Sequence, residues 1–249
     1  MLDVAIDAAK AAGELALKYF KSQPKVSYKP DNSPVTRADI EAEKLIRKII
    51  TKNFPNHGII GEELPPVNPK ARYQWVIDPI DGTRDFIRKI PYWAIFVALM
   101  DNRKPIISAI NFPAIRTFIT AQKNKGTFIN DKKTIVSKTK KLQDAYISYG
   151  SLKRFLEKDK EKNLERLVRI TSAPRSYANL GFIYFLEGKV DILVESVGAI
   201  YDFVAPALAV EEAGGKFTDF NGTYSFNSGN GVFTNNLLHS QVIKLLNSK

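Results

Sequence analysis

The sequence predicts an α/β protein with two lobes, residues 1–140 and 141–249, joined in one compact unit. Three observations support this fold class. Apolar residues recur at helical spacing in the first fifty residues, short apolar runs bounded by Gly, Pro and Asn follow, and strands and helices alternate beyond about residue 140.

Two amphipathic helices are expected at the start of the chain. Apolar and small residues recur every three or four positions in the first twenty residues, and the pattern returns from Asp39 to about Asn53, before Pro55. The residues that carry it are Leu2, Ile6, Ala9, Gly13, Ala16 and Phe20 in the first helix and Ile40, Leu45, Ile46, Ile49 and Ile50 in the second.

An antiparallel meander of strands is expected next. From Ile59 onward the sequence contains the apolar runs GII, QWVID, WAIFVALM, KPIISAINFP, RTFITAQ and GTFIN, which turn-forming residues separate. The C-terminal lobe then alternates, with strands expected at 145–149, 190–195, 216–219 and 231–234, and helices within 152–169, at 178–187, at 203–213 and at the end of the chain.

Composition excludes several classes of protein. The 249 residues are 44% hydrophobic, which is enough for a sizeable core and far from the composition of a disordered chain. There is no cysteine, so a disulfide framework, a thiolate metal site and a cysteine nucleophile are excluded. With His57 and His239 as the two histidines, a His-rich metal centre is hard to build.

We expect a cytoplasmic protein without membrane association. The longest apolar run, residues 92–100, is far shorter than the ~20 residues that span a bilayer. Asp3, Asp7 and Lys10 interrupt any signal-peptide core, and the absence of cysteine agrees with a reducing compartment.

The charge balance favours an anionic partner. The chain carries 37 Lys and Arg against 26 Asp and Glu, a net charge of +11, which raises the local concentration of anions but does not choose among phosphate esters, nucleic acid and membrane surfaces. In residues 153–169, basic and acidic side chains interleave at helical spacing. This is typical of a solvated helix face, so no nucleic-acid partner is expected.

Acidic residues cluster at the ends of three predicted strands. They are Glu62 and Glu63 after GII, Asp78 and Asp81 within the run 78–83, and Asp202 a few residues after the strand that ends at Glu195. Oxygen ligands are those that Mg²⁺ prefers, and two or three such ions could neutralise a phosphate and activate a water molecule. Backbone amides of Gly82 and Thr83, where a helix can begin, add a place for phosphate.

Each cluster alone has a simpler interpretation. Adjacent Glu62 and Glu63 are compatible with a solvated turn, and Asp202 with a helix N-cap. The run 78–83 is harder to explain in this way, because a tight turn accounts for Pro79 and Gly82 but not for two aspartates directly after a buried strand.

Together these motifs resemble a known family. The run WVIDPIDGTRDF, with GEE upstream and YDFVAPALAVEEAGG downstream, is similar to the inositol monophosphatase family of Mg²⁺-dependent, lithium-sensitive phosphatases, including its archaeal-type inositol monophosphatase/fructose-1,6-bisphosphatase members. The order and rough spacing of the motifs match over about residues 25–215. The resemblance implies the layered α-β-α-β-α sugar-phosphatase fold and a homodimer.

The resemblance also implies metal ligands and catalytic residues. The metal ligands would be Glu63, Asp78, the backbone carbonyl of Ile80, Asp81 and Asp202. Thr83 would lie beside the attacking water, assisted by Glu63 and by Asp39 of the VTRAD segment. Lys29 and Asp31 would belong to a mobile catalytic loop that helps to organise a further metal ion. The reaction would be in-line attack of a metal-activated water, with no covalent phosphoenzyme.

Substrate binding is implied for a second set of residues. Asp81 would be one of the substrate-binding residues. Gly82 and Thr83 would bind phosphate through backbone amides, and Glu195 would contact substrate hydroxyls. Two positions depart from the family's common pattern. Arg175 opens a segment in which the family often has small residues, and Arg84 follows the DGT turn, as in relatives acting on nucleotide bisphosphates or histidinol phosphate. Both arginines are candidates for binding a distal phosphate.

The resulting expectation is a phosphomonoesterase that hydrolyses myo-inositol 1-phosphate and fructose 1,6-bisphosphate. The alternatives within the family are 3′-phosphoadenosine 5′-phosphate and histidinol phosphate. A haloacid dehalogenase-type phosphatase is disfavoured, because two residues rather than one separate Asp78 and Asp81. A nucleic-acid-binding regulatory protein that keeps the phosphatase fold would explain the charge, but not a complete set of acidic ligands.

Overall fold

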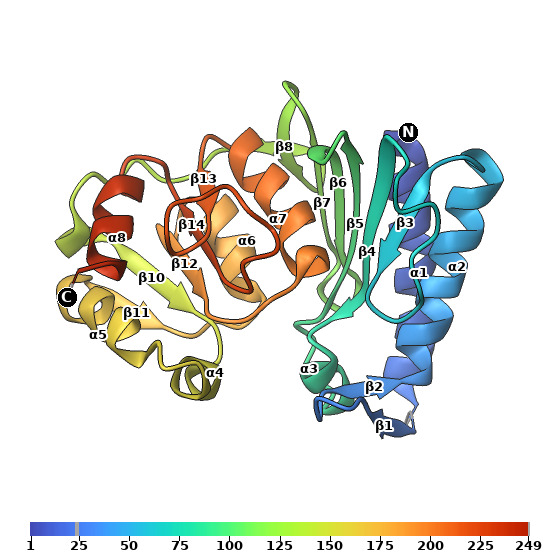
Figure 1. The fold of residues 1–249 in the computed structure, drawn as a ribbon, viewed down its shortest axis with the longest axis horizontal. Helices are drawn as coiled ribbons and strands as arrows, with labels where there is room; N and C mark the ends of the chain where they lie inside the picture. The colour runs from blue at the N-terminus through green and yellow to red at the C-terminus, as the bar shows by residue number, and fades with distance from the viewer. Residues whose placement is uncertain (23–24, 249) are drawn as a thin grey trace. The chain divides into compact units, whose positions relative to one another are not determined.

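The computed structural model describes residues 1–22 and 25–248, which fall into two units, Met1–Lys132 and Lys133–Lys249 (Figure 1). The first unit holds the predicted N-terminal helices and meander, and the second holds the alternating elements. The α/β class predicted from the sequence is confirmed.

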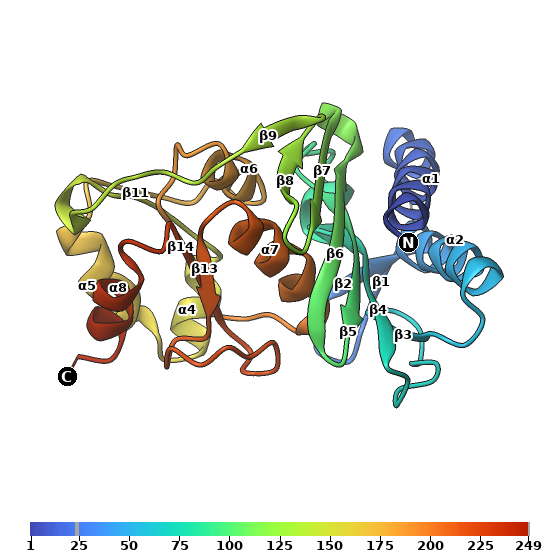
Figure 2. The same ribbon diagram turned by 90° about the horizontal axis from the view of Figure 1, so that it is seen from above.

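Two long helices pack on one face of the main sheet of the first unit. They are α1 (Leu2–Lys21) and α2 (Arg37–Asn53), which lie beside each other (Figure 2). The buried face of α1 consists mostly of alanine and glycine, so the helix approaches the sheet closely. A Cβ atom on Gly13 would lie 2.3 Å from the side-chain nitrogen of Asn111, which donates a hydrogen bond of 2.9 Å to the carbonyl of Ala9.

The main sheet of the first unit contains β3 to β8, and β9, which begins at the last residue of this unit, completes the strand order β3-β4-β5-β6-β7-β8-β9. Their bounds are β3 (Gly58–Gly61), β4 (Tyr73–Asp81), β5 (Ala94–Asp101), β6 (Lys104–Phe112), β7 (Thr117–Gln122), β8 (Gly126–Ile129) and β9 (Lys132–Thr134). Strands β4 to β8 form the expected antiparallel meander. The expectation for β3 was wrong: it pairs parallel to β4, because residues 62–72 return the chain to the end at which β3 begins.

Smaller elements complete the first unit. A hairpin of β1 (Val26–Tyr28) and β2 (Pro34–Thr36) precedes α2, and a short helix, α3 (Thr83–Ile87), follows β4. A 3₁₀ turn, η1 (Pro113–Ile115), joins β6 to β7. The sequence did not predict the hairpin, since strands of three residues with nearby prolines carry no clear alternation.

The second unit is built on a mixed five-stranded sheet in the order β11-β10-β12-β14-β13. Its strands are β10 (Tyr146–Tyr149), β11 (Ala173–Arg175), β12 (Ile192–Glu195), β13 (Lys216–Thr218) and β14 (Gly231–Thr234). Strand β10 pairs parallel with β11 and β12, and β14 pairs antiparallel with β12 and β13. Strand β11 lies at residues for which the sequence predicted neither a helix nor a strand, and is an addition to the predicted elements.

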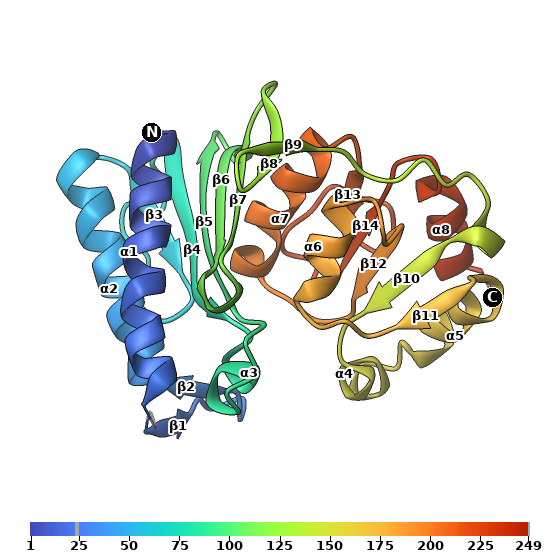
Figure 3. The same cartoon turned by 180° about the vertical axis from the view of Figure 1, so that it is seen from behind.

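Helices cover both faces of this sheet (Figure 3). On one face lie α4 (Leu152–Glu157), α5 (Glu161–Ile170) and α8 (His239–Leu246), and on the other α6 (Leu180–Leu186) and α7 (Ile200–Glu212); a 3₁₀ turn, η2 (Leu142–Asp144), precedes β10. Ile192 and Val194 of β12 join the core formed with α4, α5 and α8, whereas Leu193 points to α6. This alternation is the period of two expected for a strand covered on both faces.

Within the described parts of the chain, no helix has both the length and the apolar character needed to cross a membrane.

Candidate active site

The run from Asp78 to Asp81 ends strand β4 in a β-bulge. The pairing of β4 with β5 shifts register between these two residues. Pro79 has no N–H group to donate, which suits it to an irregular position in a sheet. The amide of Ile80 instead donates a hydrogen bond of 3.0 Å to Asp78 Oδ1. As a result, carboxylate oxygens of Asp78, which is buried, and of Asp81, which is partly buried, come within 4.8 Å of each other.

Gly82 and Thr83 turn the chain from the bulge into α3. Gly82 has φ +91°, in the left-handed region that favours glycine. Thr83 is the first residue of α3, and its hydroxyl lies 3.1 Å from the carbonyl oxygen of Ile80 and 3.2 Å from Asp39 Oδ1. The structure therefore brings the predicted catalytic Thr83 and Asp39 into direct contact.

Asp39 is fully buried at the start of α2, where it caps the helix. Its Oδ2 accepts hydrogen bonds from the backbone amide of Thr36 at 2.8 Å and from the Thr36 hydroxyl at 2.6 Å. Burial raises the pKa of the Asp39 carboxyl, although these hydrogen bonds act in the opposite direction. One oxygen is thus used by the capping box, and the other faces Thr83.

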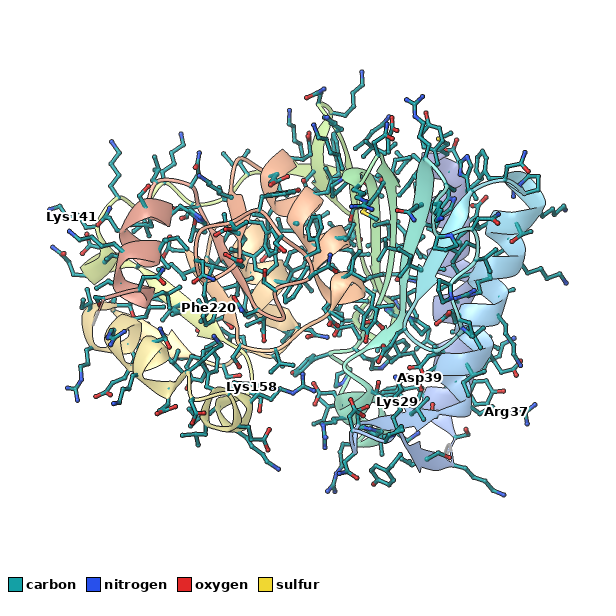
Figure 4. The ribbon with its side chains drawn as sticks, viewed as in Figure 1. Lys29, Arg37, Asp39, Lys141, Lys158 and Phe220 are labelled. Carbon is teal, nitrogen blue, oxygen red and sulfur yellow. The ribbon has the colours of Figure 1, made fainter. Side chains whose placement is uncertain are left out.

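Lys29 bridges the two acids of the GEE turn. Its ammonium lies 2.7 Å from Glu62 Oε1 and 2.7 Å from Glu63 Oε1, and Figure 4 shows Lys29 and Asp39 in the same part of the first unit. Burial raises the pKa of Glu63 to about 7, against the lowering effect of Lys29. Burial opposes the charge on Lys29, but the hydrogen bonds and charges of the two glutamates together hold the pKa of its ammonium above the ordinary value.

Asp31, the other predicted residue of this loop, is exposed in the β1–β2 turn. Its Oδ1 accepts hydrogen bonds from the Ser33 amide at 3.0 Å and from the Ser33 hydroxyl at 2.6 Å. These bonds lower the pKa of the Asp31 carboxyl. Asp31 therefore shapes its own turn, whereas Lys29 reaches the GEE acids.

Glu43 and Arg47 of α2 belong to the site although they were not predicted from the sequence. Glu43 is fully buried and accepts a hydrogen bond of 2.7 Å from the backbone amide of Glu63. Arg47 pairs with Glu43 at 2.7 Å. The signal that could have revealed them is a second acid, one turn after Asp39, on the buried face of α2 and four residues before an arginine.

Glu195 and Asp202 lie in the second unit. Glu195 ends β12, and a Cβ atom on Gly150, which follows β10, would lie 1.9 Å from Glu195 Oε2. The missing side chain of Gly150, unnoticed in the sequence, therefore makes room for the carboxylate. Burial first, and the charge of Asp202 second, raise the pKa of Glu195 to about 8.

Asp202 is the third residue of α7, which begins earlier than expected, at Ile200. Its Oδ2 accepts a hydrogen bond of 2.5 Å from the amide of Ala199. The side chain thus stabilises the helix start from its third position. The simpler interpretation of Asp202 as the N-cap was wrong, because Ala199 occupies that position.

The two arginines are both exposed. Arg84 lies in α3 of the first unit and Arg175 at the end of β11 in the second. Their role toward a substrate stays a prediction. The same holds for the expectation that Glu195, Asp202 and Arg175 share one site with the acids of the first unit.

The donor set of the first unit fits a hard cation. Glu63, Asp78 and Asp81 offer carboxylate oxygens and Ile80 a carbonyl oxygen, the ligand type that Mg²⁺ prefers. The ammonium of Lys29 between Glu62 and Glu63 shows that this turn already accommodates a positive charge.

The fold and this donor set are those of a metal-dependent phosphatase, and comparison with known proteins gives the family. The model of the inositol monophosphatase family matches residues 1–249. The chain therefore belongs to the inositol monophosphatase family, whose members depend on Mg²⁺, and it is a phosphatase of that family.

Several relatives cover almost the whole chain. Histidinol-phosphatase of Mycobacterium tuberculosis is 31% identical over 254 residues, which cover 99% of this chain and 98% of the relative. Fructose-1,6-bisphosphatase/inositol-1-monophosphatase of Thermotoga maritima is 31% identical over 249 residues, which cover 99% and 95%. The crystal structure of extragenic suppressor protein suhB from Bartonella henselae matches with a TM-score of 0.91 at 28% identity, covering 99% and 98%.

Proposed function

We propose that this chain is a phosphomonoesterase that uses two or three Mg²⁺ ions to hydrolyse phosphate esters of small alcohols, with myo-inositol 1-phosphate and fructose 1,6-bisphosphate as substrates. The observation that carries the proposal is the contact of Thr83 with Asp39 directly after the Asp78–Asp81 bulge. It places a hydroxyl and a buried carboxylate beside a group of acidic oxygen donors.

The residues of the chain have distinct tasks in this reaction. Glu63, Asp78, the Ile80 carbonyl and Asp81, with Asp202 from the second unit, would hold the metal ions. Bound Mg²⁺ would neutralise the phosphate, orient it and lower the pKa of a water molecule.

Thr83 and Asp39 would orient the attacking water. The Thr83 hydroxyl has two acceptors within 3.2 Å, the Ile80 carbonyl and Asp39 Oδ1, but a single proton. Its lone pairs therefore remain able to accept a hydrogen bond from water. The buried Asp39 fixes the direction of the hydroxyl, because its second oxygen is held by Thr36. Backbone amides of Gly82 and Thr83 would hold the phosphate.

Glu195 supports a polyol substrate. The Glu195 carboxyl can form hydrogen bonds with ring hydroxyls in either protonation state. In the ionised form, which predominates above its pKa of about 8, these bonds are charge-assisted and roughly twice as strong as neutral ones. Because Gly150 has no side chain, the Glu195 carboxylate can lie against the chain just after β10. Ionised Glu195 would repel a distal phosphate, so Arg175 or Arg84 would have to bind the second phosphate of fructose 1,6-bisphosphate.

Histidinol phosphate is the second candidate substrate. Several relatives with this activity in their name cover almost the whole chain. Arg84 follows the DGT turn, where the family resemblance associates a basic residue with histidinol phosphate or nucleotide bisphosphates. A carboxylate at Glu195 is also compatible with it, because an ionised acid attracts the amino group of histidinol.

One panel of substrates tests these proposals. Phosphate release from myo-inositol 1-phosphate, fructose 1,6-bisphosphate, histidinol phosphate and 3′-phosphoadenosine 5′-phosphate is compared with and without Mg²⁺, for the wild type, Glu195→Gln and Arg175→Ala. The polyol proposal expects Glu195→Gln to lower kcat/KM for inositol phosphate. A strong preference for histidinol phosphate, with kcat/KM for inositol phosphate unaffected by Glu195→Gln, would move the assignment to the second candidate.

A further inference from the structure

Glu43, a buried acid that takes no part in the proposed chemistry, is hydrogen-bonded to the backbone of the GEE turn. Glu43 lies on the buried face of α2 and is 0% exposed. Its Oε2 accepts a hydrogen bond of 2.7 Å from the amide of Glu63, and its Oε1 accepts one of 3.2 Å from the amide of Leu64. The side chain of one helix residue thus binds two successive backbone amides of the loop that carries Glu63.

Arg47, one turn further along α2, completes the contact. Its Nε donates to Glu43 Oε1 at 2.8 Å, while Nη2 donates to the carbonyl of Leu64 at 2.8 Å and Nη1 to that of Pro65 at 2.9 Å. The pair therefore binds both the amides and the carbonyls of residues 63–65. Such charge-assisted bonds are stronger and more directional than neutral ones.

Gly61 provides the space that this arrangement needs. A Cβ atom at this position would lie 2.1 Å from Glu43 Oε1 and 2.4 Å from its carboxyl carbon. Any side chain at Gly61 would therefore displace a carboxylate that is held on the other side by Arg47 and two amides. The glycine before the two acids is therefore explained by lack of space for a side chain. Backbone conformation does not explain it, since Gly61 has no positive φ.

The contacts also commit most of the Glu43 carboxylate to partners within the protein. A carboxylate has about four lone-pair sites. In Glu43, Oε1 faces the amide of Leu64 and the guanidinium of Arg47, which lies 2.7 Å away, and Oε2 faces the amide of Glu63. The buried charge is therefore compensated by the loop and the arginine, and it needs no cation.

We propose that Glu43 is a positioning residue, which with Arg47 and Gly61 fixes the backbone of the GEE turn so that the Glu63 carboxylate is held in place to bind a divalent cation. The inference rests on the proposed function, in which Glu63 is a metal ligand. Partners of metal ligands commonly change metal affinity 10- to 100-fold when they are substituted, because a ligand that is free to move loses its orientation.

The test compares Glu43→Gln with a matched control on the same helix. The glutamine keeps the volume but replaces one acceptor oxygen with a donor, which cannot bind both Arg47 and the two amides. Glu41→Gln removes a partly exposed acid that pairs with Lys44 at 3.3 Å and lies apart from the turn. The dissociation constant of Mg²⁺ is measured by titration calorimetry on metal-free protein, and Mn²⁺ coordination by electron paramagnetic resonance.

We expect Glu43→Gln to raise the Mg²⁺ dissociation constant by about 10-fold or more and to alter the Mn²⁺ spectrum, with an unchanged circular dichroism spectrum. At saturating Mg²⁺, KM for the substrate should stay within about 3-fold of the wild type. Glu41→Gln should behave as the wild type in each measurement. A second variant, Gly61→Ala, should reproduce the loss of metal affinity, and combining it with Glu43→Gln should add little, because both act on the same contact.

Different failures have different meanings. Wild-type metal affinity in a folded Glu43→Gln protein would overturn the positioning role and leave the proposed function intact. If Glu43→Gln does not fold, wild-type metal affinity in Gly61→Ala would overturn it in the same way. A wild type that binds no divalent cation and releases no phosphate would overturn both proposals.

Discussion

At the residue scale, the site contains carboxylates that already accept a hydrogen bond from the protein backbone through one oxygen atom. Asp39 uses one oxygen in the cap of α2 and offers the other to Thr83. Asp78 accepts the amide of Ile80 within the bulge. Pre-organisation of this kind reduces the conformational freedom that a substrate or metal would otherwise have to remove.

We expect Thr83→Ala to lower kcat by roughly 100-fold while KM changes by less than about 3-fold. The hydroxyl is proposed to orient water, whereas phosphate is held by backbone amides that the substitution keeps. Steady-state kinetics at saturating Mg²⁺ measure both constants, and Thr51→Ala on the exposed face of α2 is the control. An unchanged kcat with a strongly raised KM would mean that Thr83 binds the ground-state phosphate instead.

Asp78→Asn and Asp81→Asn should each reduce turnover by more than about 100-fold, because each replaces an anionic ligand with a neutral one at a cation site. Phosphate release is measured at saturating Mg²⁺, together with circular dichroism. The control is Asp101→Asn, since Asp101 ends the neighbouring strand β5 and pairs with Arg72 at 2.7 Å. Near-wild-type turnover in both folded variants would refute the metal assignment.

At the scale of elements, the β1–β2 hairpin places the ammonium group of Lys29 against the GEE turn. Lys29 contacts both glutamates at 2.7 Å, so a divalent ion that binds Glu63 must either displace the ammonium or share the carboxylate with it. Two positive charges at such a distance repel each other, most strongly where water is excluded.

Lys29→Met should therefore lower the dissociation constant of Mg²⁺ by roughly 3- to 10-fold, even if turnover falls because the loop has lost its charged residue. Titration calorimetry measures the affinity, and Lys25→Met, an exposed lysine before the same hairpin, serves as the control. Weaker Mg²⁺ binding in Lys29→Met would show that Lys29 helps to hold the metal rather than competing with it.

Helix α8 is joined to the second sheet by a buried histidine. His239 opens the helix, and its ring nitrogens lie 3.0 Å from the hydroxyl of Thr218, which ends β13, and 3.0 Å from that of Thr234, which ends β14. Burial first, and the charge of Lys216 second, lower the pKa of His239 to about 4. The neutral ring is therefore the form that the fold accommodates.

This predicts a loss of stability in mild acid. Above pH 6.5 the ring is neutral in both states, whereas between pH 6.5 and 4 the unfolded state takes up a proton that the folded state does not. The free energy of unfolding should thus fall by up to about 3 kcal/mol as the pH decreases through this window. Urea unfolding at a series of pH values measures it, and His239→Asn should show a shallower dependence. An equal slope in both proteins would exclude His239 as the cause.

At the scale of the whole molecule, the net charge of +11 is the difference between 37 basic and 26 acidic residues. In helices α4 and α5, where basic and acidic residues alternate, they form ion pairs. Arg169 pairs with Glu165 at 2.6 Å, and Lys153 pairs with Glu157 at 3.5 Å. These exposed pairs are typical of a solvated helix face and not of a surface that binds a phosphate backbone.

We therefore expect the protein to pass a column of double-stranded DNA at about 150 mM salt without retention, while its phosphatase activity requires Mg²⁺. Elution over a salt gradient is compared with phosphate release from a general sugar phosphate. Retention above about 0.3 M salt, together with no Mg²⁺-dependent release, would favour the nucleic-acid-binding alternative.

Local signals in the sequence were sufficient for much of this protein. The helical spacing of isoleucines predicted α2, the apolar runs predicted β4 to β8, and the unusual pair Asp78 and Asp81 indicated oxygen ligands at the end of a strand. The predictions of the helix and the strands succeed because periodicity and turn chemistry act over neighbouring residues, whereas the ligand role of the two aspartates stays a prediction. The family resemblance rests on the same short motifs.

The tertiary structure alone decided which residues support those motifs. Glu43 reaches the GEE turn, Lys29 bridges its two acids, and Gly150 makes room for Glu195, yet in each case the partner lies tens of residues away. The parallel pairing of β3 likewise depends on the path of residues 62–72. A sequence motif cannot show such contacts, because they depend on how helices and strands pack. The sequence by itself therefore determined which acidic side chains are available as ligands, because residue type is local, and the fold determined what holds them in position.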